Sequence, residues 1–489
     1  MTQAPRFGTA GIPEIFRILQ TGNARLVSIF GSIDEDRKPR VHYILDLDSH
    51  EYRVLSAPAD TPIPSATVIT PAAAWYEREL RDQFGIQIDG HPDLRPLLFH
   101  ENWPDGIHPL SQEVGDVPWA SGTYRFLKVE GAGVCEVPVG PVHAGIIEPG
   151  HFRFSVVGDT VLHLELRHFY THKGTEKLFQ GVPAMDGARI AESVSGDNCF
   201  AHAVAYSQAV ELACDVAAPR RAQALRLVGQ EMERVIAHIG DVGALCGDVG
   251  FPVPAAYTSR LKENLLQESA ALFSTRYWRS ISIPGGVTKD ISTADARRLQ
   301  RTITRVAAEF AELAQAILET PSVQNRFEST GVLKTNVARD LAVVGPVARA
   351  AGLRLDVRND HAYGAYRNWI FKPVMYHYGD VLSRARVRID ETAASALLLE
   401  EVLEDLPTGE VLATSDVHAN ATGFSAVESP RGELLYWIEI RGGRIARCHI
   451  KSPSFQNWPA LPLTMPGNII ADFPLINKSF NLSYSGCDR

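Results

Sequence analysis

The segment STADARRLQRTITRVAAEFAELAQAILETP, residues 292–321, carries apolar side chains at alternating steps of four and three. This spacing places them on one face of an α-helix. Ser292 and Asp295 form the pattern of a capping box at the start of that helix, and Pro321 cannot continue it. The segment therefore predicts a long amphipathic helix that packs in a bundle. The apolar positions are Leu299, Ile303, Val306, Phe310, Leu313 and Ile317.

A second helical pattern and two hairpin patterns surround this segment. Apolar residues recur with helical spacing from Leu225 to Val242, after Pro219. Two helices of this length indicate a mainly α-helical domain. Strict alternation at 152–166 around Gly158-Asp159, and at 434–450 around Gly442-Gly443, predicts two β-hairpins.

The N-terminal part has a different pattern. Apolar and polar residues alternate over 25–30 and 41–47, which predicts a hairpin whose strands are joined by a long polar loop over 31–40. A stretch rich in Pro, Gly and Asp begins at about Trp103. We therefore predict an α+β chain with a small α/β domain over 1–102, a linker over 103–135 and a mainly helical domain over 136–489.

Composition excludes several classes of function. The chain has 489 residues, and its 57 acidic and 48 basic side chains give a formal charge of −9, which argues against nucleic acid as a partner. It carries no secretion-signal pattern and no apolar run long enough to cross a membrane, so we expect it in the cytoplasm. Its six cysteines are scattered without a CxxC spacing, so we expect no zinc or iron–sulfur cluster on this chain.

The residues alone leave two interpretations open for the polar segments. His143, Glu148 and His151 lie in a Gly- and Pro-rich stretch just before a predicted strand, where side chains can converge on a cavity. They can equally form a loop that satisfies its own backbone. The same choice applies to His172–Lys177, which is either part of a site or a solvated turn at a helix start.

Longer motifs resemble a known family. Residues 75–85, WYERELRDQFG, with GHPDLR at 90–95, resemble the C-type subunit of complex I, the NADH-quinone oxidoreductase. Residues 140–154 and 172–178 resemble the D-type subunit of complex I and, more closely, the large subunits of group 4 membrane-bound [NiFe] hydrogenases such as formate hydrogenlyase. Further matching segments follow in the same order at 344–349, 428–433 and 452–455. The resemblance implies a fused C/D-like chain, with a C-type domain followed by a helical large-subunit domain with peripheral hairpins.

The metal motifs depart from this family. Its hydrogenases hold nickel and iron through four cysteines, and the matching positions here are Ser195, Asn198, Ser483 and Gly486. Hydroxyl and amide groups do not replace thiolates as soft, charged ligands, so the resemblance implies no Ni-Fe site and no metal on this chain. Cys199 and Cys487 each lie one residue past a ligand position. Because one step along a helix turns a side chain by about 100°, we do not expect them to restore the site, and their role stays open.

The quinone-binding motifs match only in part. His143 matches the first histidine of the headgroup loop in the D-type subunit, but Ile147 and Ser193 stand where a second histidine and a tyrosine would be. Lys173 replaces an arginine of the family and keeps its charge. Asp197 stands where hydrogenases carry an apolar residue, which indicates either a changed cavity or an acid at a helix start. We predict a cavity whose groups relay protons, with the candidates His143, Glu148, His151, Asp197 and His202.

Three functional hypotheses follow. The first is a peripheral-arm subunit of a membrane-bound, complex I-like or hydrogenase-related oxidoreductase, passing electrons from partner iron–sulfur clusters to a quinone or another acceptor, with ion translocation as a further expectation. The second is an active [NiFe] hydrogenase, and the third is a non-catalytic scaffold. The expected partners are a small iron–sulfur subunit like the B-type subunit of complex I, a ferredoxin-like iron–sulfur subunit and integral membrane subunits at the cytoplasmic face.

Overall fold

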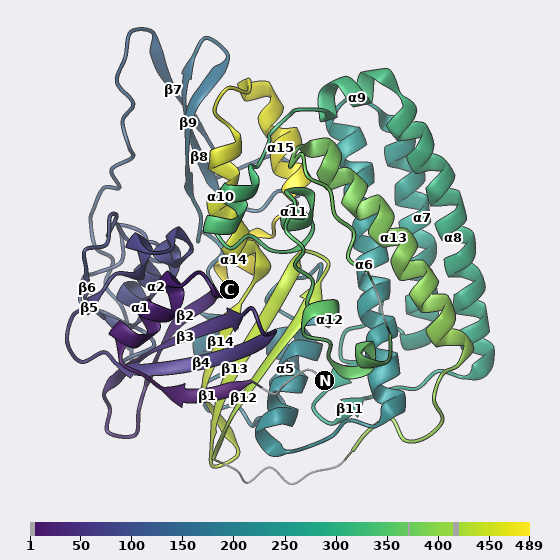
Figure 1. The fold of residues 1–489 in the computed structure, drawn as a ribbon, viewed down its shortest axis with the longest axis horizontal. Helices are drawn as coiled ribbons and strands as arrows, with labels where there is room; N and C mark the ends of the chain where they lie inside the picture. Colours follow the sequence, from purple (N-terminus) through teal and green to yellow (C-terminus); the bar gives the residue numbers. More distant parts are fainter. Residues whose placement is uncertain (1–4, 370–371, 414–419) are drawn as a thin grey trace.

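A computed structural model describes residues 5–369, 372–413 and 420–489. It confirms the α+β fold. A strand-rich N-terminal part lies beside a C-terminal sheet, and a bundle of long helices covers the other side of that sheet (Figure 1).

The N-terminal part is a four-stranded sheet in the order β1-β4-β3-β2, with α2 packed against β2. The predicted hairpin is present as the antiparallel pair β2 and β3, but its turn covers only 34–38 because both strands extend further than the alternation indicates. The elements are β1 (Arg6–Thr9), α1 (Ile12–Gln20), β2 (Ala24–Ile33), β3 (Pro39–Leu47), β4 (Glu51–Pro58), β5 (Ile63–Pro64), α2 (Ala74–Phe84) and β6 (Ile88–Asp89).

Residues 103–133, all of them described, contain neither helix nor strand. They are nevertheless fixed at several points. The Tyr124 hydroxyl donates to Glu165 at 3.1 Å, and the backbone N–H of Leu110 donates to the Gln83 carbonyl at 3.1 Å. Whether 103–135 acts as a linker between two domains stays a prediction. The chain then forms an antiparallel sheet of β7 (Val134–Val139), β8 (His151–Val157) and β9 (Thr160–Arg167), which includes the hairpin predicted around Gly158.

The long helices confirm the bundle. In α8 the Ser292 hydroxyl accepts the N–H of Asp295 at 3.1 Å, as the capping box predicts, and the apolar face is buried except that Leu313 is only partly covered. The main helices are α5 (Cys199–Cys214), α6 (Arg220–Asp248), α7 (Pro252–Phe273), α8 (Thr293–Glu319) and α13 (Val381–Glu404). Between and after them come α3 (Thr175–Leu178), α4 (Ala188–Ala191), β10 (Ser282–Ile283), β11 (Gly286–Val287), α9 (Pro321–Phe327), α10 (Thr335–Asp340), α11 (Gly345–Ala350), α12 (Val357–Asp360), α14 (Pro453–Asn457), α15 (Phe473–Phe480) and α16 (Tyr484–Asp488).

The C-terminal sheet lies at the centre of the molecule. It contains the predicted hairpin, β13 (Gly432–Arg441) with β14 (Arg444–Lys451), and a third strand, β12 (Ala421–Ser429). Residues 432–438 of β13 are buried on both faces, because α5 covers one side and the N-terminal sheet the other. The expectation of peripheral hairpins therefore holds for β7–β9 but not for β12–β14, whose side chains form the shared core.

Candidate functional site

The two motifs that match the metal-binding motifs of hydrogenases converge in space. Ser195 precedes α5 and Ser483 precedes α16, and their hydroxyl oxygens lie 2.9 Å apart although the residues are 288 positions apart in the chain. The N–H of Gly486 donates to the Ser483 hydroxyl at 2.9 Å. Asn198 is buried at the start of α5, and its Oδ1 has no hydrogen-bond partner among the described residues.

The groups at these positions do not fit a nickel–iron centre. The Ser195 hydroxyl donates to Asp197 at 2.6 Å, so it is engaged as a neutral donor, and Gly486 offers no side chain. Burial raises the pKa of both nearby thiols, those of Cys199 and Cys487, well above the ordinary value, which keeps them protonated. Within the described ranges, no cluster of three or more His, Cys, Asp or Glu side chains could hold a metal ion.

Asp197 and Arg431 lie beside these positions. They form an ion pair in which the arginine is buried while the Asp197 side chain stays 51% exposed. Burial acts to raise the pKa of Asp197, but Arg431 and the Ser195 hydroxyl hold it below its usual value. The carboxylate is therefore charged at neutral pH. It faces a space of about 350 Å³, the Asp197 cavity, lined also by Ile147, Glu148, Arg431, Ser483 and Tyr484.

A second space adjoins the first. This inner cavity of about 480 Å³ shares Asp197, Arg431 and Asn481 with the Asp197 cavity and reaches between α5, α6 and α7. Its wall includes Glu233, whose carboxylate accepts the N–H groups of Phe200 and Ala201 at 2.8 and 3.1 Å. Burial raises the pKa of Glu233 to about 8, so this group exchanges a proton near neutral pH. Glu233 was not among the residues predicted from the sequence. It could have been found there as an acidic residue within the apolar pattern of α6.

The five predicted cavity residues divide into two groups. Glu148 and Asp197 line the same cavity, and Glu148 accepts the N–H of Ser485 at 3.1 Å. His143 donates to the Gly150 carbonyl at 2.7 Å, and His151 donates to the Gly140 carbonyl at 3.0 Å. Both bonds agree with the second interpretation, a loop whose side chains satisfy its own backbone. His202 is fully buried on α5, 2.7 Å from the Tyr436 hydroxyl, and burial lowers its pKa to about 3. A role for any of the five in proton transfer stays a prediction.

The segment 172–177 fixes both converging motifs. The Lys173 amine donates to the carbonyls of Ser193 and Val194 at 2.6 and 3.1 Å, directly before Ser195. His172 donates to the Asp488 carbonyl at 2.6 Å, in the second motif. The segment is therefore a positioning element of the site and not a solvated turn.

Comparison with known proteins shows the family of this chain. Residues 7–116 match the family described as respiratory-chain NADH dehydrogenase, 30 Kd subunit, and residues 248–422 and 414–489 match its 49 Kd subunit. Hydrogenase-4 component G of Escherichia coli K12 is 32% identical over 92% of this chain and 78% of its own length. Formate hydrogenlyase subunit 5 of the same organism is 31% identical over 98% and 87%. The chain therefore belongs to the family of fused C/D-like proteins of complex I, which includes group 4 hydrogenase subunits.

A solved structure shares the fold. The membrane-bound sulfane sulfur reductase, an archaeal respiratory membrane complex, contains a chain that superimposes with a TM-score of 0.69 at 24% identity, over 73% of this chain and 99% of that one. In the part of the chain that the structure describes, no helix has the length and apolar character needed to cross a bilayer.

Proposed function

We propose that this chain is a peripheral-arm subunit of a membrane-bound, complex I-like or hydrogenase-related oxidoreductase. In this role it passes electrons from iron–sulfur clusters in partner subunits to a quinone or another acceptor bound in the Asp197 cavity, and it does so without a Ni-Fe centre. The observation that carries the proposal is the pair Asp197 and Arg431, which opens onto a cavity where the two family motifs meet.

The polar character of the cavity supports an occupant. A buried polar group without a partner costs about 1–3 kcal/mol, so a site that had only lost its metal would be more stable closed by apolar side chains. Here Ser195, Asp197 and Ser483 are joined by hydrogen bonds beside an open space instead. Reduction of a quinone consumes protons together with electrons, and Asp197 and Glu148 are the carboxylates that face the cavity.

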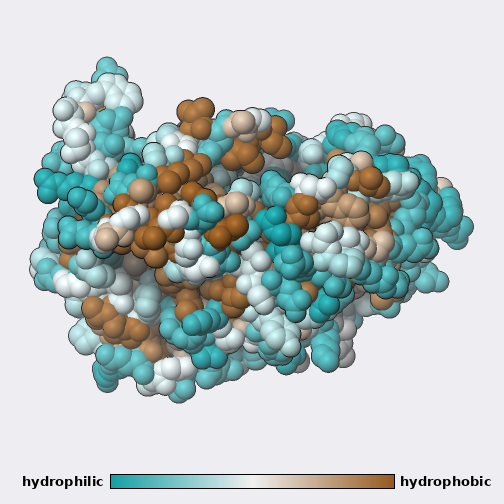
Figure 2. All heavy atoms as spheres, turned by 90° about the horizontal axis from the view of Figure 1, so that it is seen from above, coloured by the Kyte–Doolittle hydropathy of each residue, from teal (hydrophilic) through white to brown (hydrophobic). Residues whose placement is uncertain are grey.

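We further propose the partners expected from the resemblance. These are a small iron–sulfur subunit like the B-type subunit of complex I, a ferredoxin-like iron–sulfur subunit and integral membrane subunits, which would hold this chain at the cytoplasmic face and couple it to ion translocation. Exposed apolar side chains support docking on partners. Val142 and Ile146, in the loop before β8, are 87% and 97% exposed, and apolar side chains gather on the face shown in Figure 2.

The test is electron transfer in the assembled complex. Asp197→Ala should abolish or strongly reduce quinone reduction, and His143→Ala should show whether the loop takes part. Asp186→Ala, an exposed acid outside the cavity, is the control. Assembly is checked separately by purification of the complex. Unchanged electron transfer from Asp197→Ala to every quinone tried would remove Asp197 from the reaction and favour the scaffold hypothesis.

The identity to hydrogenase subunits makes an active [NiFe] hydrogenase the second candidate. The donor groups at the four ligand positions favour the first candidate, so we expect no nickel in the purified protein and no hydrogen production or uptake by its complex. Near-stoichiometric nickel by elemental analysis, or hydrogen uptake that is lost when this chain is removed, would establish the hydrogenase instead.

A further inference from the structure

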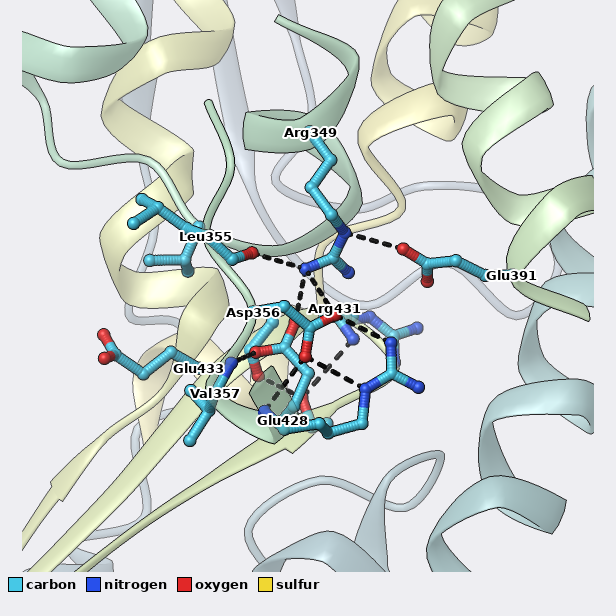
Figure 3. Close-up of polar contacts among 12 residues, drawn as sticks. Arg349, Leu355, Asp356, Val357, Glu391, Glu428, Arg431 and Glu433 are labelled. Atoms are coloured by element: carbon cyan, nitrogen blue, oxygen red, sulfur yellow. Dashed lines mark hydrogen bonds and ion pairs between the residues drawn. The ribbon is translucent and has the colours of Figure 1, made fainter. Parts of the chain in front are cut away.

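A network of charged side chains is buried around Arg349 (Figure 3). Its centre is Arg349 on α11, which is fully buried. The guanidinium donates to Glu391 of α13 at 2.6 Å, to Glu428 of β12 at 2.8 Å and to the Leu355 carbonyl at 2.7 Å. Three elements far apart in the sequence are therefore joined by one side chain.

The network continues through α12 into α6. Asp356 lies 3.3 Å from Arg349 and accepts from Arg358 at 2.7 Å. Arg358 in turn lies 3.1 Å from Glu231 of α6, which also pairs with Arg234 at 3.2 Å. Each of these side chains is at most 2% exposed, so water does not compensate their charges.

The charges of this network do not balance. The side chains joined by these ion pairs include three guanidinium groups, which stay charged in proteins, and four carboxyl groups. They are Arg234, Arg349 and Arg358 against Glu231, Asp356, Glu391 and Glu428. Because an uncompensated buried charge is costly, the missing positive charge is best supplied by a proton.

Two other buried networks in the same molecule are balanced. Around Glu433, the two cations Arg25 and Lys451 meet the two carboxylates Glu433 and Asp46. At the C-terminal end, Arg447 and Arg489 meet Glu79 and Glu176. The odd carboxyl group therefore distinguishes the Arg349 network from these two networks.

Glu428 is the carboxyl group best placed to hold the proton, because in the described part of the chain its side chain accepts from one arginine, Arg349 at 2.8 Å, and otherwise from the N–H of Val357 at 3.2 Å. Glu231 accepts hydrogen bonds from Tyr366 and Ser395 besides its arginines, and its pKa is lowered to about 2 because its arginines outweigh burial. Arg349 and a hydrogen bond from His238, which burial keeps neutral by lowering its pKa, likewise outweigh burial at Glu391 and hold its pKa well below the usual range. Burial, with Asp356 next, raises the pKa of Glu428 to about 7. The charged and titratable groups around Glu428 are Arg234 and Glu231 (α6), Arg349 (α11), Asp356, Arg358 and Asp360 (α12), Tyr363, Glu391 (α13), Glu433 (β13), and Arg25, Asp46, Tyr52 and His361 beside them.

Glu428 is connected to an open surface. A space of about 10 Å³, roughly the size that holds one water, is lined by Glu428, Asp46 and His361. His361 donates to Asp46 at 2.9 Å. Asp46 also lines a cleft of about 550 Å³ between the N-terminal sheet and the α10–α12 region, the Asp46 cleft. Protons from solvent in this cleft can therefore reach Glu428 through Asp46, His361 and a single water.

The other end of the network points toward the inner cavity. His238 donates to Glu391 at 2.9 Å, and its Nδ1 is buried without a hydrogen-bond partner in the described part of the chain. Asp241 lies one turn further along α6, so the two side chains share a helix face. Asp241 lines the inner cavity and accepts from Asn481 at 2.5 Å.

We propose that the Arg349 network stores one exchangeable proton on Glu428, takes it up from solvent in the Asp46 cleft, and releases it on the side of Glu391 and His238, toward the inner cavity, when the acceptor is reduced. The delivery step rests on the proposed function. Each transfer moves a proton only, so Glu428 becomes a carboxylate on release and is protonated again from water in the cleft. The electrons come from the partner clusters.

The first test needs no acceptor. Infrared spectra of the full-length chain, recorded on the acid and alkaline sides of pH 7, should contain a protonated-carboxyl band that titrates and that is missing in Glu428→Gln. Glu79 and Glu233, with pKa values raised by burial, contribute bands of their own, so the difference between wild type and variant is decisive. Asp48→Asn, an exposed acid at the same cleft, should keep the band. An identical band in Glu428→Gln would overturn the proposal.

A second variant tests the proposal if Glu428→Gln does not fold. Asp46→Asn removes the entry group, which is 12% exposed, and should keep the band but slow its shift on transfer to heavy water. An unchanged rate of this shift would contradict entry through the cleft.

The third test addresses delivery in the assembled complex. Glu428→Gln should slow acceptor reduction about tenfold, which is less than the 10²–10⁴ of a direct general acid, with the greater loss on the acid side of pH 7, where Glu428 holds its proton in the wild type. Asp48→Asn should leave the rate and pH profile unchanged. A titrating Glu428 band together with an unchanged rate would overturn delivery. A wild-type complex that reduces no acceptor would count against the proposed function, while the infrared comparison would still decide the stored proton.

Discussion

Two carboxylates in this molecule are paired with an arginine in opposite surroundings. Glu433 of β13 pairs with Arg25 of β2 at 2.7 Å, and its side chain is 3% exposed. Asp197 pairs with Arg431, and its side chain is 51% exposed. The same pair of charges thus joins two parts of the fold where water is excluded, and stays available to a ligand where one side is open.

The partners of the two carboxylates explain the difference. Glu433 also accepts from Tyr52 at 2.6 Å and from Lys451 at 2.6 Å, so all its surroundings are protein. These donors come from the N-terminal sheet and from β14, which places Glu433 at the contact between them. Asp197 has Ser195 and Arg431 on one side and the cavity on the other. Breaking each pair separately should therefore affect stability in one case and ligand binding in the other.

Glu433→Ala should have the largest effect. Removing one partner of a buried pair leaves the other charge uncompensated, and here it leaves the fully buried Lys451 without its carboxylate, while Arg25 keeps its pair with Asp46. We expect a loss of about 3–5 kcal/mol in the free energy of unfolding of the full chain. Denaturant unfolding at neutral pH measures it.

The matched control lies on the same strand. Glu439 pairs with Arg441 at 2.6 Å, but its side chain is 23% exposed. Glu439→Ala should cost about 1 kcal/mol or less, as is usual for partly exposed pairs. Equal losses from the two variants would mean that burial does not separate structural from available carboxylates in this fold.

The next largest change in the free energy of unfolding is expected on acidification, because of a buried histidine. His168 is 2% exposed, and its ring centroid lies 4.1 Å from that of Trp458. Neither of its ring nitrogens has a hydrogen-bond partner among the described residues. Burial lowers its pKa to about 3, whereas an unfolded histidine titrates near pH 6.5. The unfolded chain therefore takes up the proton first. This contribution to stability is complete above about pH 6.5 and is lost as the pH falls toward 3, by about 2 kcal/mol at pH 5.

His168→Phe tests this step, because it keeps a ring beside Trp458 and removes the titrating group. The variant should lose about 2 kcal/mol less than the wild type between pH 7 and pH 5. The comparison uses the difference between the two pH values, so any packing cost of the larger ring cancels. His50→Phe, at an exposed position, is the control. A pH dependence that His168→Phe leaves unchanged would show that His168 does not titrate on unfolding.

The sequence predicts the parts of this molecule that depend on local pattern. The helix over 292–321 and the hairpin around Gly442 follow from spacing and turn residues, and both are present. The convergence of Ser195 with Ser483 follows from the family motifs. Partners far apart in the chain give no such signal. Glu428 and Arg349 are separated by 79 residues, and nothing in either local sequence indicates the contact.

The location of the C-terminal sheet likewise cannot be predicted from the local sequence. Alternation of apolar and polar residues predicts a strand with one face in solvent, but β13 is buried on both faces. Its polar side chains, such as Glu433, are covered by partners on the N-terminal sheet. Only the tertiary arrangement distinguishes such a carboxylate from Asp197, which precedes a helix and faces a cavity.

A small stability change, like that of Glu439→Ala, is expected at Asp197, and it decides whether the comparison holds. Asp197→Ala removes a carboxylate that is half exposed, and Arg431, although buried, lines the Asp197 cavity, from which water can solvate it. The free energy of unfolding should therefore fall by about 1 kcal/mol or less. Denaturant unfolding of the full chain, run beside Glu433→Ala, measures this loss. A small loss together with impaired quinone reduction assigns Asp197 to the reaction. A loss near that of Glu433→Ala would instead make Asp197 and Arg431 a structural pair, and the Asp197 cavity would then lose its main argument for a bound acceptor.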